Sequence, residues 1–358
     1  MIRVPHILII GSAGRNSGKT LLTTAIIRRL GNKFPLVGLK VTTIRERGGA
    51  CPRGGKGCGV CSSLEGDFQL TEEKNPDLQK DTSRLLAAGA SRVFWLRSLR
   101  ESLESAMKHF LETAPEGCPI VCESNSARTV VDPSLFLMTK RNDEKENKAS
   151  AKDVLHLADA IIAFEENAFV PSPDDISFIN GNWALRERAA AIILAGGKSA
   201  RMGVDKSLLE IQGKTMIRRL YERLQGNFEE IIISSGEPEK YAIPGVLIVP
   251  DQTPDQGPLM GIVSAMERSK HETNFVVACD IPDMDMHIVR KMLRASEDFD
   301  AVVPVSGTDK MEPLFAVYKK KTLPLIRETL SRGKRKVRDF FPFCNVKNLK
   351  LDEKESIK

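Results

Sequence analysis

The sequence predicts an α/β protein of two domains, in which a P-loop NTPase-like fold precedes a Rossmann-like, doubly wound fold. Three observations predict it. The chain has 358 residues, more than one hydrophobic core usually serves. Short apolar runs alternate with helical patterns along both halves. A glycine-rich loop follows an apolar run in each half, at residues 11–20 and 195–206. Glycines after a buried strand let the backbone approach a phosphate closely, so both halves are expected to handle nucleotides.

The composition excludes several other classes of protein. With 41% hydrophobic and 28% charged residues the chain is typical of globular proteins. A net charge of +6, from 53 basic and 47 acidic residues, and only 6% aromatic residues do not indicate a nucleic-acid partner. The sequence contains no run of about 18 apolar residues, so no membrane span is expected. An odd number of cysteines and no secretory leader indicate reduced thiols or metal ligands and a cytoplasmic location.

The first half begins with the parts of a P-loop. An apolar strand is expected at residues 6–10 and a helix at 21–30, with glycine-rich residues and Gly-Lys-Thr between them. In such a loop backbone amides cradle phosphates, the lysine reaches the β- and γ-phosphates, and the threonine hydroxyl holds Mg²⁺. Strict spacing would require glycine at Ala13. The residues assigned to this site are Gly14, Gly18, Lys19 and Thr20.

Further strands are expected at residues 36–41, 92–96 and 119–122, with a helix from Asp81 into a glycine turn and an amphipathic helix at 99–111. Glu123 follows one of these strands at its carboxyl end, where a carboxylate that positions a metal ion or water belongs in a P-loop fold. A structural salt bridge is the alternative. The charge-alternating stretch 141–152 is expected to be a solvated loop.

Three cysteines, Cys51, Cys58 and Cys61, lie within eleven residues of a glycine-rich stretch. Thiolates with this spacing suit Zn²⁺ or an Fe–S cluster. A fourth ligand is expected from Cys118, Cys122 or the same loop of a second subunit. The alternative is a flexible loop whose cysteines have no common function.

The P-loop residues, the segments 40–43 and 81–90, and the strand that ends at Glu123 occur in this order in the molybdopterin-guanine dinucleotide biosynthesis adaptor family, which residues 1–165 resemble. The resemblance implies a domain, placed at residues 1–184, that binds GTP and assists a guanylyltransferase, with homo-oligomer formation through this domain as one arrangement. The three-cysteine segment is not part of the resemblance.

The second half, placed at residues 188–358, begins after a proline-rich stretch at 169–175. Its apolar run at 189–194 ends in a loop with two glycines and two cations, Arg201 and Lys206, that can neutralise phosphate. Strands are expected at 208–211, 230–234, 246–249, 274–278 and 301–305, with helices at 216–224, 259–266 and 287–295. Ligands of doubly wound sheets bind at the carboxyl ends of the strands.

Two aspartates follow such strands. Asp280 is the expected Mg²⁺ ligand, because this ion takes one or two protein carboxylates and completes its shell with substrate phosphates. Asp251 is assigned to nucleoside recognition, since a carboxylate accepts two hydrogen bonds from a guanine edge or a ribose. Gly257 precedes a proline at a helix start, where a base or sugar can lie close.

The residues 194–206, Pro250-Asp251, 257–261 and 279–282 resemble the molybdenum cofactor guanylyltransferase family over residues 189 to about 318. The resemblance implies transfer of GMP from MgGTP to molybdopterin with release of pyrophosphate, and molybdoenzyme apoproteins or their chaperones as partners. Position by position, Asp280 binds Mg²⁺ and the nucleotide, and the GTP-binding residues are Leu194, Ala195, Gly196, Gly197, Lys206, Asp251 and Gly257. The family often has Asn at the position of Ser234 and ends in an Asn-x-Asn-Thr-Pro segment that this sequence lacks.

The chemistry expected is attack of the acceptor phosphate on the α-phosphorus of GTP. Arg201, Lys206 and Asp280 are the catalytic residues in this hypothesis, since charge neutralisation and alignment are the main tasks. Two alternatives stay open. One is a cytidylyltransferase of the same fold, and the other is a GTP-binding accessory or metal-sensing protein whose second half has lost catalysis.

Overall fold

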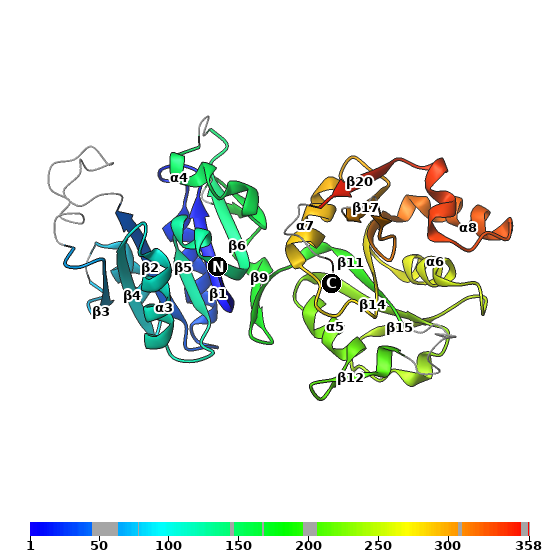
Figure 1. Cartoon of the computed structure of the whole chain (residues 1–358), viewed down its shortest axis with the longest axis horizontal. Coiled ribbons are helices and arrows are strands. Elements are labelled where there is room, and N and C mark those ends of the chain that lie inside the picture. The colour runs from blue at the N-terminus through cyan, green and yellow to red at the C-terminus, as the bar shows by residue number, and fades with distance from the viewer. Residues whose placement is uncertain are drawn as a thin grey trace. The chain divides into compact units, whose positions relative to one another are not determined.

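The structure is a computed structural model that describes residues 1–44, 64–77, 79–143, 147–166, 168–195, 206–306, 310–351 and 357. Contacts divide the chain into two compact units, Met1–Leu185 and Arg186–Lys358, and each is described by itself (Figure 1).

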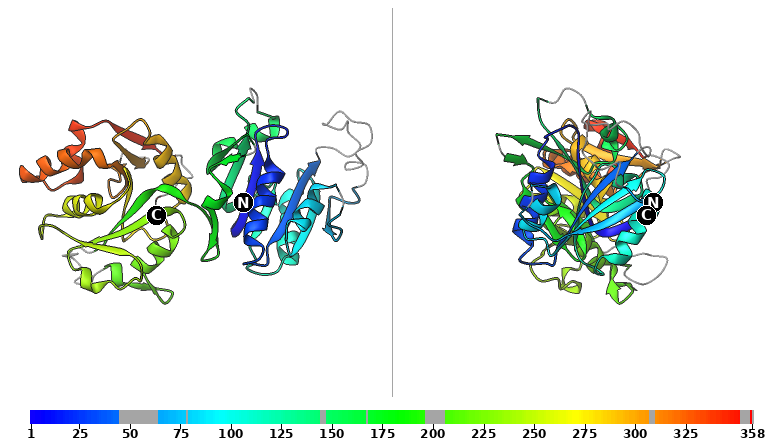
Figure 2. Two further views of the ribbon diagram at one scale, coloured as in Figure 1. Left: turned by 180° about the vertical axis from the view of Figure 1, so that it is seen from behind. Right: turned by 90° about the vertical axis from the view of Figure 1, so that its left-hand side faces the viewer.

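Unit 1 is built on an eight-stranded sheet in the order β3-β4-β2-β5-β1-β6-β7-β8. The six inner strands are parallel and the two edge strands are antiparallel to their neighbours. Figure 2 shows the sheet from behind and edge-on. The strands are β1 (Ile2–Ser12), β2 (Val37–Ile44), β3 (Phe68–Glu73), β4 (Arg92–Leu99), β5 (Ile120–Glu123), β6 (Val131–Lys140), β7 (Ala160–Glu165) and β8 (Ala168–Val170).

Helices cover both faces of this sheet. The apolar stripes of α1 (Lys19–Leu30) and α2 (Asp81–Ala87) pack on one face, and α3 (Leu103–Thr113) packs on the other. A short α4 (Ala149–Lys152) follows β6. The strands are buried on both sides, which explains why their sequences are continuous apolar runs. The expected helices at 21–30 and 99–111 are confirmed with shifted ends.

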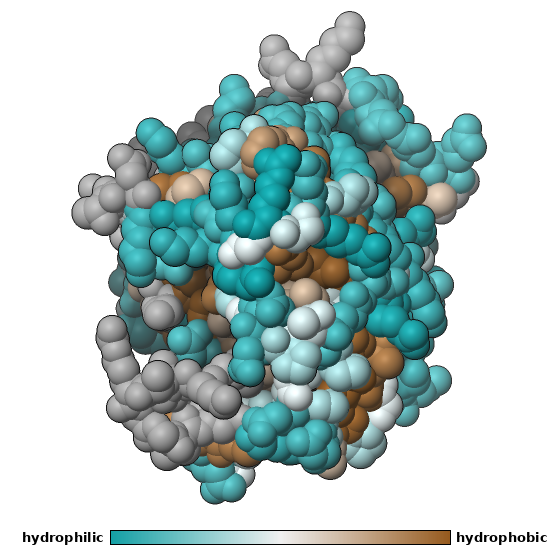
Figure 3. All heavy atoms as spheres, turned by 90° about the vertical axis from the view of Figure 1, so that its right-hand side faces the viewer, coloured by the Kyte–Doolittle hydropathy of each residue, from teal (hydrophilic) through white to brown (hydrophobic). Residues whose placement is uncertain are grey.

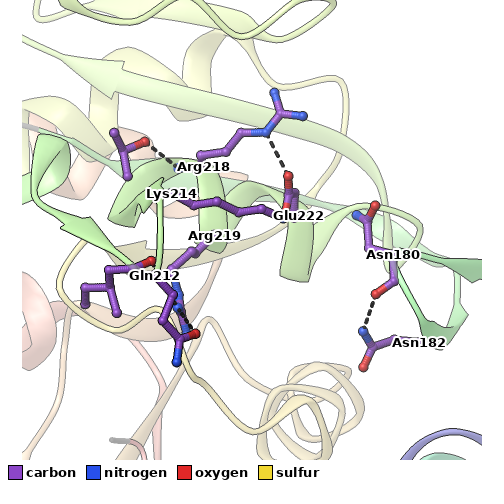
Figure 4. A network of polar contacts seen from close by, with 9 residues as sticks. Asn180, Asn182, Gln212, Lys214, Arg218, Arg219 and Glu222 are labelled. Carbon is purple, nitrogen blue, oxygen red and sulfur yellow. Dashed lines mark hydrogen bonds and ion pairs between the residues drawn. The ribbon is translucent and has the colours of Figure 1, made fainter. Parts of the chain in front are cut away.

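The last hairpin of unit 1, β9 (Ile176–Ile179) and β10 (Asn182–Leu185), turns at Asn180 and Gly181. Both turn residues have positive φ angles, 52° and 76°, which is the conformation of a two-residue type I′ turn. The Asn182 side chain donates to the Asn180 carbonyl (2.9 Å; Figure 4). Trp183 is buried and its indole N–H donates to the His6 carbonyl (3.0 Å), so the hairpin belongs to the core of unit 1.

Unit 2 has a main sheet in the order β15-β14-β11-β16-β19-β17-β18, with β20 beside β17. The helices α5 (Met216–Leu224) and α7 (Met286–Ala295) pack on one face, and α6 (Pro258–Arg268) and α8 (Leu323–Ser331) on the other (Figure 1). The strands are β11 (Glu187–Leu194), β14 (Phe228–Ser235), β15 (Leu247–Pro250), β16 (Thr273–Ala278), β17 (Ala301–Ser306), β18 (Lys310–Met311), β19 (Phe315–Lys319) and β20 (Val346–Lys350).

This sheet corrects the expectation of a purely parallel, doubly wound arrangement. The strands β15, β14, β11 and β16 are parallel, but β19 is antiparallel to both β16 and β17. The strand β19 enters between two strands that precede it in the sequence. The sheet of unit 2 is therefore mixed, with its parallel part around β11.

The strand expected at 208–211 is confirmed only in its second half. Residues Lys206–Leu208 form a 3₁₀ turn, and only β12 (Glu210–Ile211) pairs, with β13 (Lys214–Thr215). Gln212 and Gly213 both have positive φ angles, so a tight turn ends the pairing after two residues. Contacts join this turn to α5. Lys214 of β13 and Arg218 of α5 both form ion pairs with Glu222, and Arg219 donates a hydrogen bond to the Gln212 side chain (Figure 4).

The surface agrees with the charged composition. Figure 3 shows one face that hydrophilic side chains mostly cover, with apolar atoms visible in the hollows between them. Among the helices in the described ranges, none has the length and apolar character needed to cross a bilayer.

Candidate functional site

The candidate site of unit 2 is centred on the carboxyl end of β11. Leu194 lies between Ser234 of β14 and Ala278 of β16 in the sheet register. The Ala195 N–H donates to the Ser234 carbonyl (2.8 Å), and the Cys279 N–H donates to the Leu194 carbonyl (3.1 Å). The strand ends are thus tied together, and the glycine-rich loop leaves from their centre.

Part of the predicted loop lies outside the described residues. This applies to Gly196, Gly197 and Arg201. The backbone of Lys206 begins a 3₁₀ turn, and its side chain is not described. The roles assigned to these residues stay predictions.

Asp251 follows β15 and is half-buried. Burial raises the pKa of its carboxyl, and the hydrogen bond from Ser234 partly offsets this rise. The Ser234 hydroxyl lies 3.4 Å from Asp251 Oδ1 and 3.0 Å from the Gly261 carbonyl oxygen. Asp251 is thus brought against the first turns of α6 and the end of β14.

Glycine at position 261 allows three side chains to approach α6 closely. A Cβ there would lie 3.0 Å from Ser234 Oγ, 3.4 Å from Asp251 Oδ1 and 3.4 Å from Leu194 Cδ2. Leu194 and Asp251, which are far apart in the sequence, therefore border the same helical turn. Gly257 caps this helix with a positive φ of 72° and is exposed, and Pro258 occupies the first turn.

Asp280 lies two residues beyond β16, and its side chain is exposed. The Ile281 N–H donates to the Ala278 carbonyl (3.2 Å), so the chain turns at this point. Since β16 is the direct neighbour of β11, the turn places Asp280 at the same edge of the sheet as Leu194 and Ala195. An exposed carboxylate at this edge is a suitable oxygen ligand for Mg²⁺.

In unit 1, the P-loop joins β1 to α1. Gly18 caps α1 with a left-handed backbone (φ 81°). A Cβ at this position would lie 2.9 Å from Cγ of Phe164 on β7, closer than real Cβ contacts. Both the φ angle and the contact require glycine at this position. Lys19 and Thr20 follow as the first residues of the helix.

Thr20 of α1 and Glu123 of β5, both assigned to the predicted Mg²⁺ site, lie close together. The Thr20 hydroxyl donates to Glu123 Oε2 (3.3 Å). Glu123 is 1% exposed, and its Oε1 has no hydrogen-bond partner among the described residues. Burial raises the pKa of Glu123, and the positive charge of Lys19 opposes this rise. A buried carboxylate oxygen beside a threonine hydroxyl fits a hard cation such as Mg²⁺.

Sequence reasoning missed a second charge pair beside this site. Lys40 of β2 is the register neighbour of Glu123 and forms an ion pair with Asp81 at the start of α2. Burial of Asp81 opposes ionisation, but the Lys40 hydrogen bond and the charges of Lys40 and Lys19 outweigh it and lower the pKa of Asp81. The available signal was that Lys40 and Asp81 lie in the segments 40–43 and 81–90, which are part of the family resemblance of this half.

Two residues that brace the P-loop were also missed. Asn125 accepts from the Ser12 N–H (2.8 Å) and donates to the Ser12 carbonyl (3.0 Å). Lys148 donates to Ser12 Oγ (2.5 Å) and to the Gly14 carbonyl (3.4 Å). The expectation of a solvated loop at 141–152 is therefore wrong at Lys148, which contacts the P-loop. These contacts join residues more than 110 positions apart, and no local pattern predicts them.

The three cysteines predicted to bind Zn²⁺ or an Fe–S cluster lie outside the described residues. Within the described ranges, no group of three or more His, Cys, Asp or Glu side chains is arranged to hold a metal ion. Cys122, one of the expected fourth ligands, is fully buried in β5, and burial raises the pKa of its thiol. The structure gives no support to a zinc or iron–sulfur site in the part of the chain that it describes.

Unit 2 is a nucleotidyltransferase domain, because residues 191–347 match the MobA-like NTP transferase domain family. A protein of Pelotomaculum thermopropionicum named "Probable molybdenum cofactor guanylyltransferase" is 42% identical over 159 residues, which are 44% of this chain and 77% of that protein. A protein of the same name from Carboxydothermus hydrogenoformans is 34% identical, over 45% of this chain and 81% of that protein. The chain therefore belongs to the molybdenum cofactor guanylyltransferase family.

Among solved structures, the molybdopterin-guanine dinucleotide biosynthesis protein A of Archaeoglobus fulgidus is 20% identical. It aligns with 45% of this chain and 83% of its own length, with a TM-score of 0.39.

Proposed function

We propose that unit 2 transfers GMP from MgGTP to molybdopterin, giving molybdopterin guanine dinucleotide and pyrophosphate. The observation that carries this proposal is the meeting of Leu194, Asp251 and Gly261 at one edge of the sheet, with Asp280 two residues beyond the neighbouring strand β16. Membership of the guanylyltransferase family supports the choice of substrates.

In this proposal Asp251 accepts hydrogen bonds from the nucleoside, while Gly196, Gly197 and Gly257 allow the phosphates and sugar to lie close to the backbone. Arg201 and Lys206 neutralise the negative charge that develops on the phosphates. Asp280 would hold Mg²⁺, which orients the triphosphate and stabilises the leaving pyrophosphate. The acceptor phosphate is already a good nucleophile, so alignment is the main contribution of the chain.

We infer that unit 1 is a GTP-binding accessory domain, with boundaries near residues 1–184, fused to a transferase domain at 188–358. Gly14, Gly18, Lys19 and Thr20 would bind the phosphates, and Thr20 with Glu123 would hold Mg²⁺. The buried, unpartnered oxygen of Glu123 supports this proposal. Molybdoenzyme apoproteins or their chaperones are the proposed acceptors of the product, and the cytoplasm is the proposed location.

Pyrophosphate release from GTP in the presence of molybdopterin tests the transfer activity. Asp280→Ala should lower turnover at least 100-fold while the thermal unfolding midpoint stays unchanged, because Asp280 is an exposed side chain. Asp283→Ala, an exposed carboxylate that pairs with Arg219 instead, is the matched control and should keep its turnover. Equal turnover of Asp280→Ala and wild type would refute the assignment. Higher turnover with CTP than with GTP would favour a cytidylyltransferase.

A further inference from the structure

Ser234 stands at the centre of the contacts around Asp251. It is 2% exposed and is the last residue but one of β14. Its hydroxyl lies 3.0 Å from the Gly261 carbonyl oxygen and 3.4 Å from Asp251 Oδ1. A serine hydroxyl carries one proton, so it donates to only one of these acceptors at a time.

The two acceptors do not need this proton equally. Gly261 lies inside α6, so the helical pattern already gives its carbonyl the N–H of Ala265. The Asp251 carboxylate is half-buried, and Ser234 is the hydrogen-bond donor that acts on its ionisation. A buried carboxylate without donors is costly, so the ionised form draws the proton of Ser234.

The two oxygens of Asp251 have different surroundings. Oδ1 faces Ser234 and lies 3.4 Å from the position that a Cβ of residue 261 would occupy. Oδ2 lies on the side of Gly236, 3.7 Å from the position that a Cβ of that residue would occupy, which is an ordinary van der Waals distance. Ser234 therefore acts on Oδ1, and Oδ2 is the oxygen that Ser234 does not contact.

We propose that Ser234 is a positioning residue that holds Asp251 through Oδ1, so that the nucleoside is recognised by Oδ2 alone. Ser234 itself makes no contact with the nucleotide in this arrangement. The inference rests on the proposed role of Asp251 in nucleoside binding. It narrows that role from two accepting oxygens to one, and predicts that removal of the serine hydroxyl acts only through Asp251.

The test is a double-mutant cycle on nucleotide affinity, measured by calorimetry with MgGTP and, in parallel, MgCTP. All variants carry Lys19→Met, so that the P-loop does not contribute binding. Ser234→Ala should weaken binding about 5- to 20-fold, the effect of one lost hydrogen bond to a charged group. Ser234→Thr keeps the hydroxyl and should restore affinity to within about twofold. In an Asp251→Ala background, which has no side-chain acceptor, Ser234→Ala should have no further effect.

Ser235→Ala is the matched control, because Ser235 is also 2% exposed on β14 but its hydroxyl accepts from the Glu237 N–H (3.1 Å). It should leave affinity unchanged. An equal loss from Ser234→Ala with and without Asp251 would overturn the proposal, as would no loss in either background. If the protein binds GTP but releases no pyrophosphate, GMP transfer is refuted. The double-mutant cycle still tests the role of Ser234 in that case. Binding of neither nucleotide by wild-type unit 2 would refute both.

Discussion

Asp251 is half-buried, and burial raises the pKa of its carboxyl. If Asp251 binds the nucleoside, its protonation should change the KM for GTP. The ionised carboxylate is the form that accepts hydrogen bonds from a nucleoside. Because its pKa is raised, protonation begins at a higher pH than for an exposed aspartate. We expect KM for GTP to rise as the pH falls, starting above the range in which ordinary aspartates titrate. This rise of KM at low pH should be absent in Asp251→Asn. If the variant shows the same rise, a group other than Asp251 causes it.

Glu123 gives a prediction in which stability and function oppose one another. Its buried Oε1 has no partner among the described residues, and such a group costs about 1–3 kcal/mol. Burial also raises the pKa of Glu123, so its charged form is disfavoured at this position. Glu123→Gln removes this buried charge and should raise the free energy of unfolding of unit 1 without ligand by about 1 kcal/mol. The same change should weaken MgGTP binding at the P-loop at least tenfold.

Thermal unfolding of the chain with and without MgGTP measures both effects of Glu123→Gln. Asp280→Ala in the same chain removes the proposed metal ligand of unit 2 and serves as background. If the ligand-free variant is less stable than the wild type, Glu123 makes a stabilising contact in the fold. That result would favour the alternative of a structural salt bridge.

At the scale of elements, the start of helix α1 depends on Gly18, which joins it to the P-loop in a left-handed conformation. Gly18→Ala should destabilise unit 1 by about 2–4 kcal/mol, of which about 1–2 kcal/mol is the left-handed backbone and the rest the contact with Phe164. Gly117→Ala is the matched control, because its φ is 69° and no atom lies within 4 Å of its Cβ position. Denaturant unfolding of both variants separates the two terms. Equal losses would show that Phe164 moves away freely.

The same scale shows how much of the fold the sequence predicts. The helix after Gly18 and the strand before Leu194 follow from apolar runs and glycines that lie next to each other in the sequence. The strand Phe315–Lys319 has an equally apolar sequence, but its direction and its place between β16 and β17 depend on partners 15 to 46 residues away. Local patterns carry no information on strand direction, so the mixed sheet was not predicted.

The site divides in the same way. Glu123, Asp251 and Asp280 were predicted because a carboxylate at a strand end is a local signal. Lys148 and Asn125 brace the P-loop across more than 110 residues, and Ser234 acts through a carboxylate on another strand. Such contacts depend on which strands become neighbours, and only the folded sheet determines that.

At the scale of the whole molecule, each unit has its own sheet, its own core and its own candidate nucleotide site. We therefore expect the full chain to bind two molecules of GTP. Lys19→Met should remove one by deleting the charge that faces the β- and γ-phosphates, and Asp251→Asn should weaken the other about tenfold or more.

Calorimetric stoichiometry on the full chain measures this, with Lys33→Met, a lysine outside both sites, as the charge-matched control. If each variant loses affinity for GTP at one site only, the two sites bind GTP independently. If either substitution changes the affinity of both sites, the sites are coupled. The coupling free energy must then be the same from unit 1 to unit 2 as from unit 2 to unit 1. A single molecule of GTP in the wild-type chain, unchanged by Lys19→Met, would remove the accessory GTP site from the proposal and leave the transfer site of unit 2.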